Sequence, residues 1–274
     1  MTAPREPATP RAPRLPLPAM RRARDDGAIF GVHLDDLPST ERLRERCARF
    51  LDGAGGSRIF TPNPEILLRA RSDASYVALL NSADLALPDG TGVAAITSIR
   101  RRRRVRRWPG VDVASEVLRL AVDRGLTAVF LGGRPGAAEQ AARVWRDRLR
   151  GLRIEVVGAG VAFDEEGRAV EGEGEADLVD TIRRAGPGVL LVGLGAPKQE
   201  RWIGRHADEL PEIKIFIGVG GSFDIWSGLL PRAPHPLRRL GLEWAWRLAL
   251  EPRRLPRILR ATVEFPIRAL VETR

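Results

Sequence analysis

Short apolar runs alternate with amphipathic helical patterns from Ile29 onward, and this alternation limits the possible folds more than any other feature. Buried-strand patterns occupy residues 58–61, 84–87, 126–131, 154–157, 188–192 and 213–219. Helical patterns begin at Pro64 and after Gly90, and cover residues 137–149, 176–185 and 198–206. Repeated strand–helix units place parallel strands in one sheet. The sequence therefore predicts an α/β, Rossmann-like fold, with a mainly parallel sheet and helices on both faces.

Both ends of the chain depart from this pattern. Residues 1–26 carry prolines among arginines, which sustain neither a helix nor a sheet ladder, so we expect disorder there. From residue 232 onward, ten arginines stand against four glutamates, with apolar residues between them at helical spacing. We therefore expect three regions: a disordered N-terminus (1–26), an α/β domain (27–230) that holds the candidate site residues, and a basic amphipathic C-terminal appendage (231–274).

The formal net charge of +10 favours polyanionic partners, which include nucleic acid, an anionic membrane surface and phosphates. Cys47 is the only cysteine and the three histidines are scattered, which argues against a disulfide and a zinc site. The sequence has no apolar run of membrane-spanning length and no signal-peptide pattern, so we expect a cytoplasmic protein.

Four polar loops follow predicted strands, at 61–65, 88–92, 193–200 and 218–224. Ligands of open α/β sheets bind at the carboxyl ends of strands, where glycine lets the backbone approach closely. The glycines that we take as candidates are Gly132, Gly133, Gly195, Gly220 and Gly221. Glycine turns also occur for structural reasons alone, and neither the dinucleotide fingerprint nor a P-loop is present, since Lys198 stands where the former requires glycine.

Asp89 lies between Pro88 and Gly90, at the end of a predicted strand. It either forms an Asx-turn or helix cap, or acts as a general base toward an attacking hydroxyl. Thr61 and Asn63 either position the same nucleophile or satisfy a turn. Arg107 is the member of the arginine run 100–107 best placed to reach a diphosphate, although such a run is often only a solvated face.

Taken together, these loops resemble the WecG/TagA/CpsF family of bacterial glycosyltransferases. The matching strings, in family order, are TPNPEILLRA (61–70), ADLALPDGTGV (83–93), GLGAPKQERWI (193–203), GVGGSFD (218–224), RAP (232–234) and GLEWAWRLALEPRR (241–254). The proline-rich N-terminus and the very basic 100–107 segment depart from the family pattern.

The resemblance implies an inverting, metal-independent transfer of an N-acetylmannosamine-type sugar or related hexose from UDP to a polyprenyl-diphosphate-linked sugar, with no cofactor. It implies that Asp89 is the catalytic base, with Thr61 and Asn63 in the same pocket, and that Arg107 and Gln199 lie near the donor. We group Lys198 and the five candidate glycines with them on the donor side. Arg247, Arg254 and Arg257 would neutralise diphosphate charge from an appendage that closes over the site at the inner face of the cell membrane.

Three other functions have to be weighed against this one. A nucleic-acid-binding protein lacks support because no RNA-recognition signature is present. A dehydrogenase lacks its glycine fingerprint. A non-catalytic, membrane-associated relative that binds a UDP-sugar or lipid phosphate is the third. A homo-oligomer is compatible with all of them.

Overall fold

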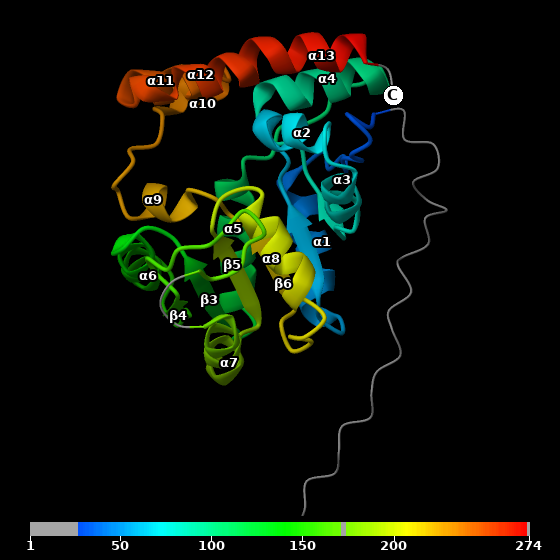
Figure 1. Ribbon diagram of the computed structural model, residues 1–274. Helices are drawn as coiled ribbons and strands as arrows, with labels where there is room; N and C mark the ends of the chain where they lie inside the picture. The colour runs from blue at the N-terminus through cyan, green and yellow to red at the C-terminus, as the bar shows by residue number, and fades with distance from the viewer. Residues whose placement is uncertain (1–26, 171–173, 273–274) are drawn as a thin grey trace, which may run out of the picture.

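One parallel sheet forms the centre of the molecule, and the structure, a computed structural model, describes residues 27–170 and 174–272 (Figure 1). The strand order is β2-β1-β6-β5-β3-β4, and all five neighbouring pairs are parallel. The strands are β1 (Ser57–Phe60), β2 (Leu85–Ala86), β3 (Thr127–Gly132), β4 (Arg153–Val157), β5 (Val189–Gly193) and β6 (Ile215–Gly218). The predicted α/β fold is confirmed, whereas the expectation for residues 1–26 lies outside the described residues.

Helices cover both faces of this sheet, as predicted. One face packs against α1 (Thr40–Asp52), α5 (Gly110–Val122), α6 (Ala137–Arg148) and α9 (Ser222–Trp226). The other packs against α2 (Pro64–Ala70), α3 (Ala74–Asn81), α7 (Glu175–Ala185) and α8 (Lys198–His206). Within β3, Ala128 and Phe130 enter the first core while Val129 and Leu131 enter the second, because successive strand residues point to opposite faces.

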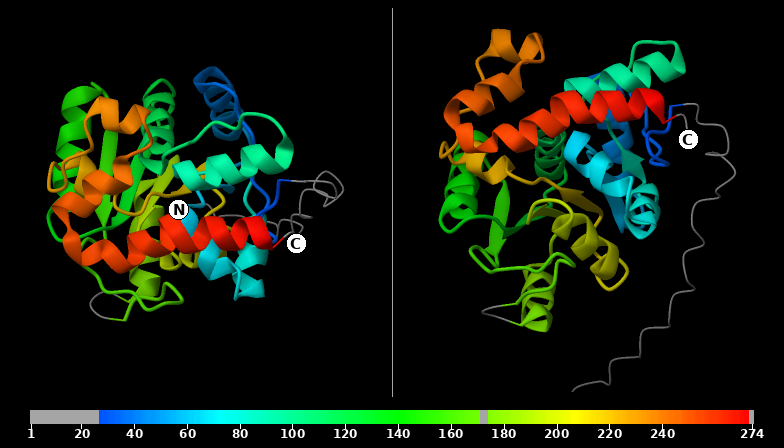
Figure 2. Two further views of the ribbon diagram at one scale, coloured as in Figure 1. Left: turned by 90° about the horizontal axis from the view of Figure 1, so that it is seen from above. Right: turned by 45° about the horizontal axis from the view of Figure 1, so that its top comes forward.

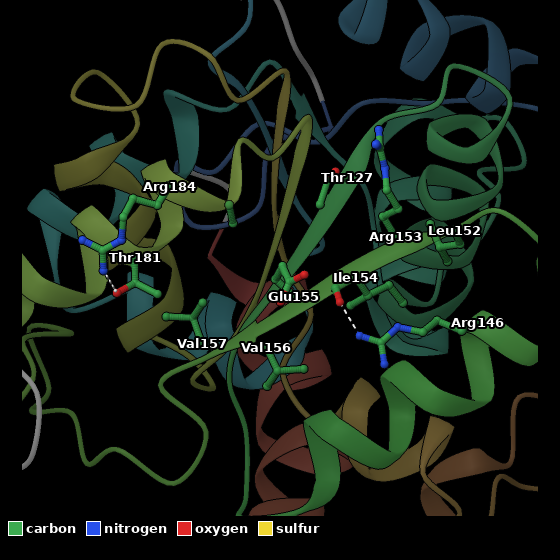
Figure 3. Close-up of a pocket in the computed structure, with 11 residues that line it drawn as sticks. Thr127, Arg146, Leu152, Arg153, Ile154, Glu155, Val156, Val157, Thr181 and Arg184 are labelled. Atoms are coloured by element: carbon green, nitrogen blue, oxygen red, sulfur yellow. Dashed lines mark hydrogen bonds between the residues drawn. The ribbon is translucent and has the colours of Figure 1, made fainter.

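One of the two edges of the sheet is strand β4, which pairs only with β3 among the described strands. Figure 3 shows the groove along β4, with Arg146 of α6 and Arg184 of α7 on its two sides. The Arg146 guanidinium donates to the carbonyl of Ile154. Arginine side chains therefore occupy and charge an edge that would otherwise offer free backbone groups to another strand.

The last part of the chain forms a band of short helices across one end of the sheet (Figures 1 and 2). Its members are α10 (His235–Arg239), α11 (Glu243–Leu250), η2 (Pro252–Arg254), α12 (Leu255–Leu259), η3 (Arg260–Glu264) and α13 (Phe265–Val271). Prolines stand in the first turn of α10, η2, α12 and α13, where the missing N–H costs no helical hydrogen bond.

The end of this band is anchored in the core beside α4 (Thr91–Arg101). Phe265 of α13 is fully buried and meets Phe30 edge-on, with 6.1 Å between ring centroids. Such aromatic burial adds apolar area and a favourable ring geometry. Among the described residues, no helix combines the length and the apolar content that crossing a bilayer requires.

Candidate functional site

The candidate site lies where the loops after β1 and β2 meet the beginning of α5. The Asp89 N–H donates to the carbonyl of Pro62 over 3.0 Å, which joins the two loops. The Gly110 N–H, at the start of α5, donates to Asp89 Oδ2 over 3.2 Å. The carboxylate therefore faces the positive end of a 13-residue helix.

Gly110 allows this close approach because it has no side chain. A Cβ atom at this position would lie 2.7 Å from Thr61 Oγ1 and 3.9 Å from Asp89 Oδ2. The Thr61 hydroxyl, the Asp89 carboxylate and the backbone of α5 thus share one small space. The structure brings together these two side chains, which the sequence analysis placed in one pocket.

The protonation of Asp89 is set by opposing effects. Burial raises the pKa of Asp89 to about 6, while the Gly110 N–H and the nearby Arg107 charge act in the opposite direction. The Glu243 carboxylate raises it further. A carboxyl group with such a pKa is mostly ionised at neutral pH and is still basic enough to accept a proton from a substrate hydroxyl.

Asn63 is used by the fold itself. Its side-chain oxygen accepts a hydrogen bond of 3.0 Å from the Ile66 N–H, and it is the N-cap of α2. Asn63 therefore has the structural role of a helix cap, where the sequence analysis offered a turn as its structural alternative, and it lies on the same loop as Thr61.

Gln199 is buried and connects two of the candidate loops. Its Oε1 accepts from the Gly220 N–H over 2.8 Å, and its Nε2 donates to Glu200 Oε1 over 2.7 Å. Tyr76 donates its hydroxyl to the second Glu200 oxygen over 3.0 Å. Gln199 therefore fixes the glycine loop after β6. Lys198, the residue before Gln199, donates to the carbonyl of Phe163. Its ammonium group is therefore directed to the loop that contains Phe163.

The candidate glycines lie at the carboxyl ends of β3, β5 and β6. Gly132, Gly133, Gly195 and Gly220 have positive φ angles of 78°, 90°, 77° and 50°, which favour glycine. At Gly133, a Cβ atom would also lie 2.9 Å from the Phe223 ring. At Gly195, no atom lies within 4 Å of the corresponding position. Packing thus explains part of the glycine pattern, and Gly195 alone of these four borders open space.

Two of the candidate arginines lie close enough to Asp89 to interact with its charge. Arg107 donates to Glu243 Oε2 over 2.7 Å and to the carbonyl of Arg238 over 3.0 Å. Arg247, half-buried on α11, brings its Nη2 to 3.8 Å from where a Cβ of Gly221 would lie. Among the described residues, the Arg247 guanidinium has no hydrogen-bonding or ion-pair partner. A half-buried guanidinium over a glycine loop is suited to an anionic ligand.

The other two candidate arginines of the C-terminal band, Arg254 and Arg257, form ion pairs with glutamates. Arg254 contacts Glu251 over 2.8 Å within the band, and Arg257 contacts Glu65 of α2 over 2.7 Å. Both pairs are at least partly exposed.

The sequence analysis missed Glu243 and Arg232. Arg232 forms a two-point ion pair with Asp112 of α5, at 2.8 and 2.7 Å, and its Nε lies 3.7 Å from Glu243. The acid within the GLEW string was the available signal for Glu243, but its partner lies 136 residues away in the sequence. Within the described ranges, no group of three or more His, Cys, Asp or Glu side chains is arranged to hold a metal ion.

The family comparison and the comparison with curated proteins agree with each other. The model of the glycosyl transferase WecG/TagA/CpsF family matches residues 28–274. A protein of Staphylococcus aureus (strain MRSA252), named N-acetylglucosaminyldiphosphoundecaprenol N-acetyl-beta-D-mannosaminyltransferase, is 29% identical over 232 residues, covering 84% of this chain and 87% of its own. Proteins with the same name from S. aureus strains NCTC 8325 / PS 47 and COL are 28% identical over the same lengths.

Proposed function

The chain belongs to the WecG/TagA/CpsF family of glycosyl transferases, and from this we propose that it moves an N-acetylmannosamine-type sugar from UDP to a polyprenyl-diphosphate-linked N-acetylglucosamine. The names of its S. aureus relatives support this acceptor and this sugar. The observation that carries the mechanism is Asp89, a partly buried carboxylate beside Thr61 and the start of α5, with arginines near it.

In the proposed step, Asp89 takes the proton of the acceptor hydroxyl as its oxygen bonds to the anomeric carbon. The bond from that carbon to the UDP oxygen breaks, and UDP leaves with the electron pair. A single displacement of this kind inverts the anomeric configuration. Because Thr61 lies beside Asp89, its hydroxyl is positioned to orient the acceptor.

Charge develops on the leaving diphosphate, and preorganised positive groups stabilise it. Arg247 supports this role, since its guanidinium lies over Gly221 without a partner among the described residues. Burial and the adjacent Arg254 lower the pKa of Arg247. Both effects disfavour its positive charge, and a bound anion would compensate for them. Arg107 would join it after release from Glu243. We propose that these arginines replace a metal ion, with Gln199 holding the glycine loop of the donor site.

The C-terminal band supports peripheral binding to an anionic membrane, where a polyprenyl acceptor would reside. Large apolar side chains on the band are exposed. The exposed fraction is 45% for Leu255, 49% for Leu259 and 58% for Ile267. Arg253 and Arg260 are exposed among them. An amphipathic helical surface with basic residues binds the interface of anionic lipids. On this proposal the inner face of the cell membrane is the working location.

The decisive experiment measures UDP release with a short-chain polyprenyl-diphosphate N-acetylglucosamine acceptor, a panel of UDP-sugars and EDTA. We expect acceptor-dependent release with an N-acetylmannosamine donor, and a decrease of about 100-fold or more in Asp89→Asn. Exposed Asp208→Asn is the matched control.

Two results would contradict the proposal. Full turnover by Asp89→Asn would remove the general base. Binding of UDP without transfer to any acceptor, by protein shown to be folded, would favour the non-catalytic relative instead.

A further inference from the structure

A large arginine-lined cavity lies beside the candidate site, on the outer face of α5. Its volume is about 1310 Å³, and it is lined by residues of α4, the 104–109 loop, α5, α6, α9 and α10. In Figure 1 the chain leaves α9 and rises to α10 above α5. None of the five candidate glycines lines it. The cavity is thus distinct from the glycine loops proposed to hold the donor, and it shares Arg107 with the groups proposed for the donor side.

The cavity nevertheless reaches the reacting end of the molecule. Thr91 and Pro109 are among the residues that line it. Pro109 directly precedes Gly110, whose N–H binds Asp89. A ligand that entered through the cavity would therefore approach Asp89 past Pro109 and the start of α5. Two substrates that must meet at one base need two such approaches.

The lining carries a large excess of positive charge, with eight arginines against two carboxylates. Some of this charge is already neutralised, since Arg232 pairs with Asp112 and Arg107 with Glu243. Within the described part of the chain, Arg104, Arg148, Arg238 and Arg239 form no ion pair with a carboxylate. Unneutralised guanidinium groups around one cavity attract phosphate oxygens.

Indole rings accompany these charges. Trp108, Trp145 and Trp226 line the cavity, and the Arg106 guanidinium lies 4.3 Å from the Trp108 ring centroid. Arg148 lies 5.9 Å from that of Trp145. Leu240, 70% exposed, stands at the rim. The lining therefore offers cationic groups and apolar surface together, which matches a molecule with a phosphate head and a hydrocarbon chain.

We infer that this cavity binds the diphosphate and first prenyl units of the lipid-linked acceptor, and so forms an acceptor subsite distinct from the donor loops. The inference rests on the proposed function, because the acceptor is there a polyprenyl diphosphate. Arg148 and Arg238 are the side chains that we expect to contact phosphate oxygens.

The test uses titration calorimetry on the full chain, with farnesyl diphosphate, inorganic pyrophosphate and UDP as separate probes. The variant is Arg148→Gln/Arg238→Gln, and the matched control is Arg150→Gln, just past α6 and outside the cavity lining. We expect the double variant to bind farnesyl diphosphate about tenfold more weakly. UDP affinity should stay unchanged in both variants, which also shows that they are folded.

Unchanged farnesyl diphosphate binding by the double variant would overturn the inference, as would an equal loss of UDP binding. Pyrophosphate binding as tight as that of farnesyl diphosphate would overturn the prenyl part and leave a bare anion site. Loss of sugar transfer with every donor, with the expected binding pattern intact, would instead count against the proposed function while supporting the subsite.

Discussion

Glu243 of α11 accepts a hydrogen bond of 2.7 Å from Arg107, which precedes α5 on the α/β body. This ion pair connects the C-terminal band to the loop that precedes α5, at the candidate site. The same carboxylate raises the pKa of Asp89, while Arg107 lowers it. One contact thus couples the position of the band, the availability of an arginine and the protonation of the proposed base.

Glu243→Gln should therefore tighten UDP binding and shift the pH profile. Releasing Arg107 from a partly exposed pair should strengthen UDP affinity about two- to fivefold. Since Glu243 raises the pKa of Asp89, its removal should move the acidic limb of kcat/KM to lower pH. Titration with UDP and a pH–rate profile check both effects. Glu264→Gln, which alters an ion pair on the same band, should change neither, and weaker UDP binding by Glu243→Gln would show that the pair organises the donor site.

Asp89→Asn should raise stability at neutral and higher pH. An acid whose pKa is raised on folding stabilises the folded state at low pH, and this contribution is lost as pH rises through the folded pKa of about 6. The amide avoids burying a charge and should gain at most about 3 kcal/mol in the free energy of unfolding. Denaturation at pH 4 and pH 8 tests the sign. Equal gains at both pH values would show that ionisation is not the cause.

Gln199→Leu should destabilise the fold and weaken UDP binding together. The substitution leaves the Gly220 N–H and the buried Glu200 without hydrogen bonds that they now make. We expect a loss of about 1–3 kcal/mol in the free energy of unfolding. Tyr76→Phe is the matched control, since it removes one hydrogen bond of Glu200 without touching the glycine loop. UDP affinity equal in the two variants would refute the role of Gln199 in that loop.

Leu255→Gln/Leu259→Gln should reduce binding to vesicles that contain anionic lipid, with folding unaffected because both side chains are exposed. Loss of two apolar contacts should weaken partitioning at least tenfold. Sedimentation with vesicles measures it, and Val170→Gln, exposed outside the band, is the control. Undiminished sedimentation would exclude this part of the band as the membrane contact.

Local patterns in the sequence predicted most elements of the sheet and the helices beside it. The helix at 198–206 has the predicted bounds, because a proline precedes it and its apolar residues follow the helical period. The run from Ile29 was less informative, since Ile29 and Val32 only form an isolated antiparallel bridge around Phe30 and Gly31, both with positive φ. The strand order also could not be read from the sequence, because it depends on crossovers between distant segments.

Site residues could be predicted from the sequence where a polar side chain directly follows a predicted strand. They could not be predicted where a contact between distant segments determines the partner of the side chain. Asp89 and Thr61 follow neighbouring strands, so topology brings them together. The partners of Arg107 and Lys198 lie on segments whose approach no local pattern encodes. The cavity beside α5 is likewise a product of packing between five helices.

The absence of a side chain at Gly110 has a consequence for interpreting genomes. Any larger residue there would press on Thr61 and displace it from Asp89, even in a sequence that keeps every acid and every arginine of the site. A homologous chain that carries alanine or a bulkier residue at this position is therefore a candidate for a member that has lost transfer activity. A single codon can thus help to separate working enzymes from inactive descendants before any protein is made.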